Sequence, residues 1–177
     1  DDSTIHYFYK DDEGSSQLYY DEDGLELTVT KQDNTCIMTD KYGNKKTFVK
    51  NSNDYYYLTQ IEDVSGNKIQ IQLDSNNRIT KVIDANNAEI TLAYDNTITT
   101  ITSPDSTTSG NNITSIETMN GTTNFSYDNN NLITSICNVN GLKINYEYCS
   151  ELPYRVKKVI QYGLNNALGN SFSVEYG

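Results

Sequence analysis

A four-residue pattern with apolar residues at its first and fourth positions recurs along the chain, and it constrains the fold more than any other feature. We refer to this pattern as the tetrad. Its copies are LTQI, ITKV, ITTI, ITSI, ITSI and VKKV, at Leu58–Ile61, Ile79–Val82, Ile98–Ile101, Ile113–Ile116, Ile133–Ile136 and Val156–Val159. Most copies lie about twenty residues apart, a spacing that indicates one supersecondary unit used repeatedly.

Alternating segments and turn residues fill the space between the tetrads. Gly- or Asn-bearing turns follow most of them: DVSGN (Asp63–Asn67), DANNA (Asp84–Ala88), TMNG (Thr118–Gly121) and NVNG (Asn138–Gly141). The next segments, KIQIQLD, EITLAYD, TNFSYD and LKINYEY, alternate strictly and predict strands with one buried face. A second turn opens at Asp74, Asp95 and Asp128, where Asp can bond the backbone two residues on and the following Asn tolerates left-handed dihedrals. Each unit is therefore predicted to be a β-hairpin.

The spacing of three between the apolar residues of the tetrad does not fit strict alternation. A β-bulge inside each such strand would restore the alternation and bend the sheet. Pro is rare (2 residues) and Tyr is abundant (15 residues), as suits a pleated, half-buried surface. We therefore expect an all-β fold, an antiparallel, curved and twisted sheet of successive β-hairpin repeats.

This sheet is expected to form one domain over residues 1–177. Residues 1–57 are predicted to be lead-in strands, including GLELTVT, TCIMTD and KKTFVK. Residues 58–101 and 113–177 carry the hairpin repeats. The segment 102–112, TSPDSTTSGNN, has no apolar residue and contains Pro104 and Gly110, so it is predicted to be a loop.

The net charge of −11 argues against some partners. Residues 1–24 hold most of the excess acid, with Lys10 as their only base. An acidic chain repels phosphate backbones, so a nucleic-acid partner is not expected.

No apolar run reaches membrane-spanning length and no secretory leader opens the chain. Since the sequence does not begin with Met, we expect an excised piece. Cys36, Cys137 and Cys149 lack CxxC spacing, which predicts neither a disulfide framework nor a zinc site.

The repeats resemble the RHS repeat, also called the YD repeat. LDSNNRITKVIDANNAEITLAYD (Leu73–Asp95) follows that pattern almost throughout, and YDNNNLITSICNVNGLKINYEY (Tyr127–Tyr148) follows it with Leu132 in place of Arg. The segments His6–Val29 and Tyr56–Ile71 are similar to the lead-in of the repeats in wall-associated proteins of Gram-positive bacteria.

The resemblance implies a spiral of hairpins that closes into a shell around a C-terminal toxin or effector, in a secreted or cell-wall protein of the bacterial surface. It implies a non-enzymatic wall segment, whose partner is the remainder of its own polypeptide. The strand expected at SFSVEYG (Ser171–Gly177) would have an open edge, so in isolation we expect edge-to-edge homodimers. The alternative is a module that binds cell-wall or host glycans.

Three candidate sites follow from the residue types. Exposed rings of Tyr7, Tyr9, Tyr55 and Tyr57 could stack on sugar. Packing of the rings in a sheet with one solvent-exposed face accounts for these residues as well. Asp21, Asp23 and Glu26 around a tight turn could hold Ca²⁺, or form a solvated acidic turn, because the remaining ligands of the twelve-residue calcium loop are missing. His6, the only histidine, has no sequence neighbour that predicts catalysis or zinc binding. We therefore expect no catalytic residue and no cofactor other than Ca²⁺.

Overall fold

The structure is a computed structural model that describes residues 5–11, 17–95, 99–102, 107–110, 112–152 and 154–176. Fifteen strands follow one another in one antiparallel sheet, and β10 and β11 form a separate pair. Within the described ranges there is no α-helix, only a 3₁₀ turn, η1 (Leu164–Asn166), and no helix that could cross a membrane. The expected all-β, antiparallel fold is confirmed.

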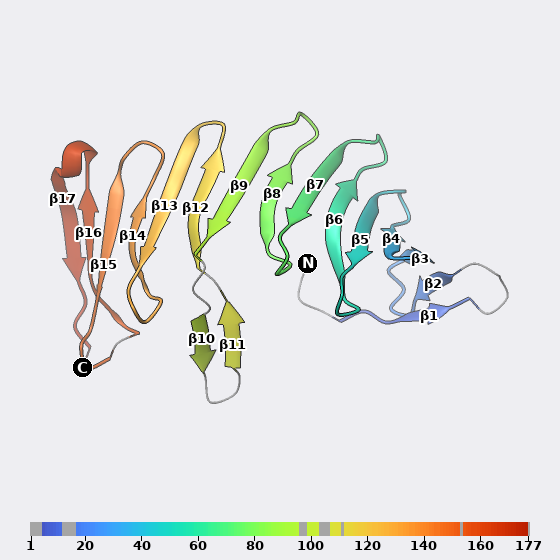
Figure 1. The fold of residues 1–177 in the computed structure, drawn as a ribbon, viewed down its shortest axis with the longest axis horizontal. Coiled ribbons are helices and arrows are strands. Elements are labelled where there is room, and N and C mark those ends of the chain that lie inside the picture. Colours follow the sequence, from blue (N-terminus) through green and yellow to red (C-terminus); the bar gives the residue numbers. More distant parts are fainter. Residues whose placement is uncertain are drawn as a thin grey trace. The chain divides into compact units, whose positions relative to one another are not determined.

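The chain divides into two compact units, Asp1–Glu89 and Ile90–Gly177, which we call unit 1 and unit 2. The strands of unit 1 are β1 (Phe8–Lys10), β2 (Leu18–Asp21), β3 (Thr28–Gln32), β4 (Thr35–Thr39), β5 (Lys45–Lys50), β6 (Tyr56–Glu62), β7 (Lys68–Leu73) and β8 (Ile79–Ile83). Each pairs antiparallel with the next, so the unit is a run of adjacent hairpins (Figure 1).

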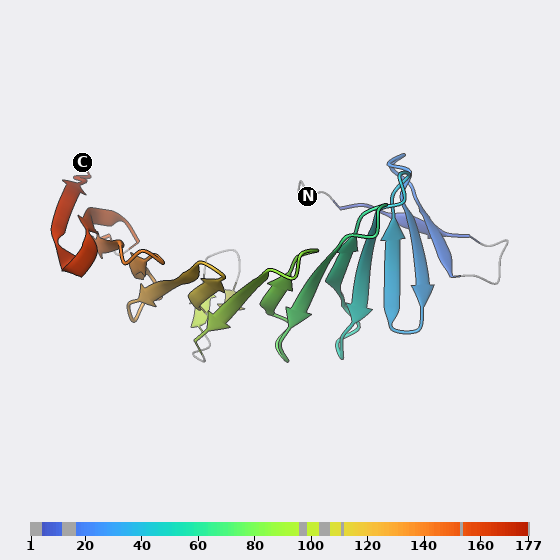
Figure 2. The ribbon, with the colours of Figure 1, turned by 90° about the horizontal axis from the view of Figure 1, so that it is seen from above.

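Unit 2 repeats this arrangement. Its strands are β9 (Glu89–Tyr94), β12 (Ile113–Thr118), β13 (Gly121–Tyr127), β14 (Ile133–Cys137), β15 (Lys143–Tyr148), β16 (Val156–Tyr162) and β17 (Leu168–Ser173), and β9 begins at the boundary residue Glu89. They pair in that order, and β17 forms the edge of the sheet (Figure 1). Figure 2 shows that successive strands within each unit are rotated relative to one another, as expected for a twisted sheet.

The segment predicted as a loop over 102–112 is the main difference from expectation. Its residues Thr107–Gly110 form β11, which pairs with β10 (Thr99–Thr102) in a two-stranded hairpin. The loop prediction relied on the lack of apolar residues, but Thr has a high β propensity of its own, and a ladder of backbone bonds does not require an apolar face. The tetrad copy at Ile98–Ile101 lies partly outside the described residues.

The predicted bulges are present, and they fall at one repeat position. The pairing register shifts across the second residue of the tetrad, so that this residue is the extra one: Thr59, Thr80, Thr114, Thr134 and Lys157. The Oγ1 of Thr59 donates to Thr47 O (3.3 Å) and that of Thr80 to Gln72 O (3.3 Å). Because the bulge absorbs the odd residue, the first and fourth residues of each tetrad share one face.

One turn geometry closes seven of the hairpins that the structure describes. An Asp or Asn accepts bonds at its side-chain oxygen from the backbone N–H groups two and four residues on, and the residue three positions on has positive φ. Asp128 shows the pattern: Oδ1 accepts from Asn130 N (2.8 Å) and Leu132 N (3.0 Å), and Asn131 has φ 63°. The turn recurs at Asp40, Asn51, Asp63, Asp74, Asp84, Asp128 and Asn138.

The Asx-turns predicted at Asp74 and Asp128 are therefore confirmed. At Asp95, the third predicted position, Oδ1 accepts instead from Asn112 N (3.1 Å), since β10 and β11 are inserted after it.

Tyrosines at the strand ends form a second repeated contact. The hydroxyl groups of Tyr127 and Tyr148 donate to the carbonyl oxygens of Ile113 and Ile133, both at 2.8 Å. Each acceptor is the first residue of a tetrad, beyond the last paired residue of the hairpin. Tyr176 donates in the same way to Val156 O at 2.9 Å.

The strand predicted at 171–177 differs in its bounds from the observed one. β17 begins earlier, at Leu168, and ends at Ser173.

Apolar side chains gather on one face of each unit. Paired residues share a face, so the register places Val29, Met38, Phe48, Leu58, Ile61, Ile69, Ile71, Leu73, Ile79 and Val82 together in unit 1. We call this set the apolar face of unit 1. The register of unit 2 likewise aligns Leu92, Ile116, Phe125, Ile136, Ile144, Tyr146, Val159 and Phe172.

Neither face is packed to the density of a core. Among the described residues, the most deeply buried hydrophobic side chain is Ile160, at 8% exposure, and it pairs with Asn145 and Ser171 on the opposite face; on the apolar faces, Ile69, Ile79 and Phe172 are 39%, 40% and 57% exposed. A two-layer domain normally buries such a face against a second element. In the part of the chain that the structure describes, both apolar faces are therefore left partly exposed to solvent.

Candidate functional site

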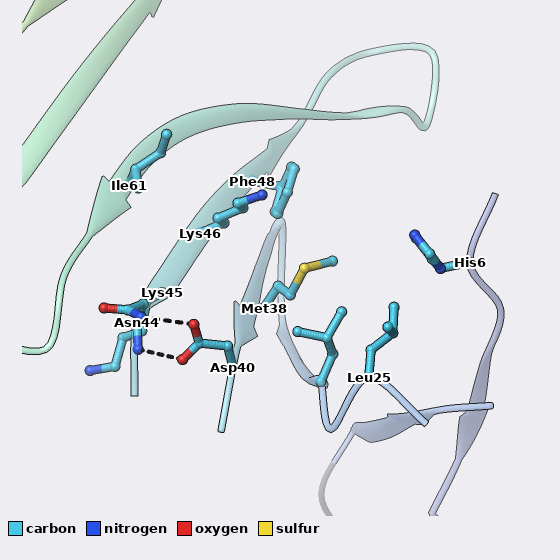
Figure 3. Close-up of a pocket in the computed structure, with 10 residues that line it drawn as sticks. His6, Leu25, Met38, Asp40, Asn44, Lys45, Lys46, Phe48 and Ile61 are labelled. Atoms are coloured by element: carbon cyan, nitrogen blue, oxygen red, sulfur yellow. Dashed lines mark hydrogen bonds between the residues drawn. The ribbon is translucent and has the colours of Figure 1, made fainter. Parts of the chain in front are cut away.

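A hollow of about 570 Å³ lies on the apolar face of unit 1. Leu25, Leu27, Met38, Phe48 and Ile61 line it with apolar groups, and His6, Asp40, Asn44, Lys45 and Lys46 add polar ones. Figure 3 shows Met38, Lys46, Phe48 and Ile61 projecting from neighbouring strands into one space, with Leu25 facing them and His6 on the far side. The site is therefore an apolar depression with a cationic side chain inside it.

The pairing register determines which strand side chains reach the hollow. Met38 of β4 pairs with Lys46 of β5, and Lys46 pairs with Ile61 of β6. Phe48 lies two residues beyond Lys46 and so projects from the same face. Three neighbouring strands thus supply the floor.

The segment between β2 and β3 supplies the opposite wall. Gly24 and Glu26 have positive φ values of 74° and 56°, which fold the segment back so that Leu25 and Leu27 line the hollow. The backbone closes between Asp21 N and Leu27 O at 3.1 Å. Asp21 also accepts from Leu27 N at Oδ2 (3.3 Å) and from Asp23 N at Oδ1 (2.7 Å). Its carboxylate is therefore a turn-forming group.

Asp40 and Asn44 lie at the edge of the hollow, in one of the recurrent turns. Asp40 Oδ2 accepts from Asn44 Nδ2 at 2.8 Å, and Oδ1 accepts from two backbone N–H groups (Figure 3). The side-chain bond from Asn44 is the largest reason that the pKa of Asp40 is held below its ordinary value of 3.8. This carboxylate is ionised at neutral pH and engaged by its own turn.

The calcium candidates point to separate partners. Asp23 Oδ2 lies 3.0 Å from His6 Nδ1, and Glu26 Oε2 lies 3.5 Å from Lys41 Nζ, while Asp21 is engaged by the backbone as described above. In the part of the chain that the structure describes, no group of three or more His, Cys, Asp or Glu side chains could hold a metal ion. The structure does not bring Asp21, Asp23 and Glu26 together as a ligand set.

The contact between His6 and Asp23 is the arrangement closest to a catalytic dyad. A histidine–carboxylate pair performs nucleophilic catalysis only when a hydroxyl or thiol lies within reach of the imidazole. The described residues that line the hollow include no Ser, Thr or Cys. Cys36 pairs with Lys31 and Phe48 within the sheet, and Cys36, Cys137 and Cys149 are all half-buried free thiols.

The tyrosine candidates lie outside the hollow. Tyr55, Tyr7 and Tyr9 are 68%, 63% and 52% exposed, and the ring of Tyr9 is 5.8 Å from that of Tyr20. Tyr57 is half-buried and pairs with Val49, on the face opposite the apolar one. Tyr55 and Tyr57 belong to one strand and its turn, whereas Tyr7 and Tyr9 belong to β1 and the residues before it.

Sequence reasoning missed Lys46. The residue that pairs with the fourth residue of a tetrad is Ile71, Leu92, Phe125 or Tyr146 in the other hairpins, but Lys46 opposite Ile61. Aligning the strand before each tetrad, KKTFVK with KIQIQL and TNFSYD, would have exposed the exception. That alignment requires the position of the bulge, which the structure supplies.

No family model matches the chain, and no curated protein matches it.

Proposed function

We propose that the chain is a non-enzymatic structural segment of a bacterial cell-surface or secreted RHS/YD-repeat protein, where it forms part of the wall of a β-shell around a C-terminal toxin or effector. The observation that carries this proposal is the pair of apolar faces that no second layer of described residues covers, because repeated hairpins must bury such faces against another part of the assembly. The partner of the faces is then the remainder of the same polypeptide.

The regularity of the units supports a wall instead of a catalytic fold. The bulge, the turn and the tyrosine contact each occupy a constant repeat position, so the chain varies little from one hairpin to the next. An active site depends on a local departure from such a pattern, where several unlike groups converge. The described lining of the hollow combines apolar groups with two lysines, Lys45 and Lys46, an Asp and an Asn that bond each other within a turn, and His6, and it includes no Ser, Thr or Cys.

Thiol accessibility tests the wall proposal. Ile69 and Gln70 are both exposed neighbours in β7, but Ile69 pairs with Ile61 on the apolar face and Gln70 pairs with Gln60 on the opposite face. In a background with the native cysteines replaced by alanine, we expect Ile69→Cys and Gln70→Cys to react equally fast with a thiol reagent in the isolated chain. In the complete polypeptide, Ile69→Cys should react at least about tenfold more slowly, as buried thiols do.

Equal reactivity of the two thiols in the complete polypeptide would rule out a covered apolar face, and with it the wall proposal. Protection of Gln70→Cys alone would place the covered side on the polar face and would equally contradict it.

Glycan binding is the second candidate, and the exposure of Tyr55 at 68% favours it. An exposed ring stacks on the apolar face of a sugar, and such rings at a binding surface carry much of the affinity. Screening of cell-wall and host glycans with Tyr55→Ala and Tyr57→Ala tests this function. Saturable binding that is lost in those variants and kept in Tyr154→Ala, a control 77% exposed in unit 2, would establish it.

A further inference from the structure

The second strand of a hairpin in unit 2 ends in three residues that pair only with the strand after it. In β13, Asn124 is the last residue that pairs with β12, and residues 125–127 pair with β14 alone. In β15, Asn145 is the last residue that pairs with β14, and residues 146–148 pair with β16 alone. We call these three residues the terminal triplet of the hairpin. Each of these two triplets is therefore the docking position of the next strand.

Residues 174–176 are the equivalent triplet of the last hairpin. Ser173 is the last residue of β17 that pairs with β16, and its partner Lys158 is the third residue of a tetrad. Asn124 and Asn145 pair in the same way with the third residues of the two preceding tetrads. β17 forms the edge of the sheet, so in the described part of the chain no following strand pairs with residues 174–176.

Contacts with β16 hold this triplet in place. Val174 N donates to Lys157 O at 2.9 Å, which extends the ladder one residue beyond β17. The hydroxyl of Tyr176 donates to Val156 O at 2.9 Å, and the guanidinium carbon of Arg155 lies 4.9 Å from the centre of the Tyr176 ring. Because backbone groups alternate in direction along a strand, those of the residues on either side of Val174 point to the open edge. The edge is therefore formed before any strand binds to it.

The earlier triplets show which strand fits. In both of them the first residue pairs with the fourth residue of the following tetrad, the second with the third, and the last, a Tyr, with the first. The second residue of the tetrad is the bulged one and has no partner of its own in this register. Val174, Glu175 and Tyr176 thus select the fourth, third and first residues of a tetrad. A strand without the bulge would lose one of these pairs, because a shift by one residue turns its side chains to the other face.

The carboxylate of Glu175 selects the charge of the third tetrad residue. Residues directly opposite each other on an antiparallel pair interact, and opposite charges there are favourable while like charges are not. The equivalent residue Glu147 pairs with Lys158. In the hairpin before it, the uncharged Ser126 pairs with the uncharged Ser135. A basic residue is therefore the matching partner of Glu175.

We infer that the triplet 174–176 is the docking site of a further β-strand that carries a tetrad with Lys or Arg at its third position. The strand lies beside β17, with the first residue of its tetrad opposite Tyr176 and its basic residue opposite Glu175. Main-chain hydrogen bonds supply the affinity, and the side chains supply the register. The inference concerns the edge of unit 2 and not the apolar faces, so it goes beyond the wall proposal and does not depend on it.

Binding of a labelled peptide to the 177-residue chain tests the inference. The probe is the sequence of residues 74–83, DSNNRITKVI, which holds a tetrad with Lys as its third residue. One matched peptide has Glu in place of that Lys, and a second lacks the Thr of the tetrad and cannot form the bulge. Fluorescence anisotropy of a dye on the peptide measures the affinity, at chain concentrations where light scattering shows a monomer. We expect the probe to bind at least about fivefold more tightly than the Glu peptide and about tenfold more tightly than the peptide without Thr.

A charge exchange separates Glu175 from the general acidity of the chain. Glu175→Lys should weaken the probe about fivefold and strengthen the Glu peptide by a similar factor, because the exchange restores opposite charges. Glu117→Lys is the matched control, since it changes the net charge equally. Glu117 is exposed and pairs with Thr91 and Thr122 inside the sheet, so its exchange should leave the preference between the two peptides unchanged. Circular dichroism of both variants verifies that the sheet is retained.

The remaining outcomes each overturn one statement. Equal affinity of the probe and the peptide without Thr would refute the tetrad register. The same preference between the Lys and Glu peptides in Glu175→Lys and Glu117→Lys would refute the pairing with Glu175. Absence of binding by all three peptides would refute the docking site itself. The wall proposal is decided separately, by the reactivity of Ile69→Cys in the complete polypeptide.

Discussion

Replacing Tyr148 with Phe removes one hydroxyl and leaves the ring in place. That hydroxyl donates to Ile133 O at 2.8 Å, at the point where β14 and β15 have stopped pairing. In Tyr148→Phe, the carbonyl oxygen of Ile133 therefore loses a hydrogen bond that the β14–β15 ladder does not replace. Tyr127 makes the equivalent bond to Ile113 O, also at 2.8 Å.

The size of the effect follows from the burial of the bond. A typical intramolecular hydrogen bond contributes roughly 0.5–1.5 kcal/mol, and leaving a buried partner unsatisfied costs about 1–3 kcal/mol. The bonds of Tyr127 and Tyr148 are partly buried, so we expect Tyr148→Phe and Tyr127→Phe each to lower the free energy of unfolding by about 1–1.5 kcal/mol. Tyr176→Phe should lose less, because its bond to Val156 O is exposed and water can replace it.

Urea unfolding followed by tyrosine fluorescence measures these differences. The control is Tyr154→Phe, whose side chain is 77% exposed in the same unit. We expect the control to stay within about 0.3 kcal/mol of the parent, as is usual for surface changes. A Tyr148→Phe variant as stable as the parent, or a control that loses as much, would refute the structural role of these hydroxyl groups.

Alkaline pH provides an independent measurement of the same contacts. Burial, followed by the nearby charge of Asp128 and by Tyr146, raises the pKa of Tyr148, and burial and Asp95 raise that of Tyr127, both from the ordinary value of 10.0. Each folded pKa lies above its unfolded value, so the stability is present below pH 10 and is lost as the pH rises through the folded pKa. The double variant Tyr127→Phe and Tyr148→Phe should lose less stability above pH 10 than the parent.

Three further outcomes are expected. Asn87 has φ 62°, so Asn87→Ala should lower the free energy of unfolding by about 1 kcal/mol and Asn87→Gly should not; equal losses in urea melts would contradict this. Hydrogen bonds and ion pairs lower the pKa of Asp40, Asp54, Asp63 and Asp74 below 3.8, so stability should be present above that pH and fall as acid titrates the folded state. Asp63→Asn should reduce this acid dependence in thermal melts, because Asn51 and Asn138 show that Asn forms the same turn. Every residue of β17 is exposed and its sequence LGNSFS is uncharged, so light scattering should show concentration-dependent dimers that Phe172→Lys abolishes; a strict monomer would exclude edge pairing.

Local pattern was enough to predict the hairpins, the turns and the bulges. The tetrad requires a bulge because Ile133 and Ile136 cannot share a face of a regular strand, and the register shift at Thr134 has that cause. The Asx-turn at Asp128 needs only Asp128 and the left-handed tolerance of Asn131, both visible in the sequence. Interactions between residues that are close in the sequence are therefore the ones that a single sequence predicts.

Contacts that depend on a second or third strand could not be predicted in the same way. The acceptor of Tyr148 is defined by where the β14–β15 ladder ends, and the position of Lys46 between Met38 and Ile61 appears only when β4, β5 and β6 are in register. The strand at Thr107–Gly110 was missed because apolar alternation was the criterion, and that criterion fails for a ladder of Thr and Ser residues.

The tyrosine contact also defines the increment by which such a chain can grow or shrink. Tyr127 and Tyr148 each pair with the first residue of the following tetrad and donate to the first residue of the preceding one. Removing residues 128–148 would join Tyr127 to the segment that now follows Tyr148, with its donor and acceptor relations intact. In-frame duplication or loss of one such block of coding sequence therefore conserves every backbone and hydroxyl pairing at the junction, whereas a shorter indel breaks the register on both sides. Homologues of this chain should accordingly differ in length by whole hairpins.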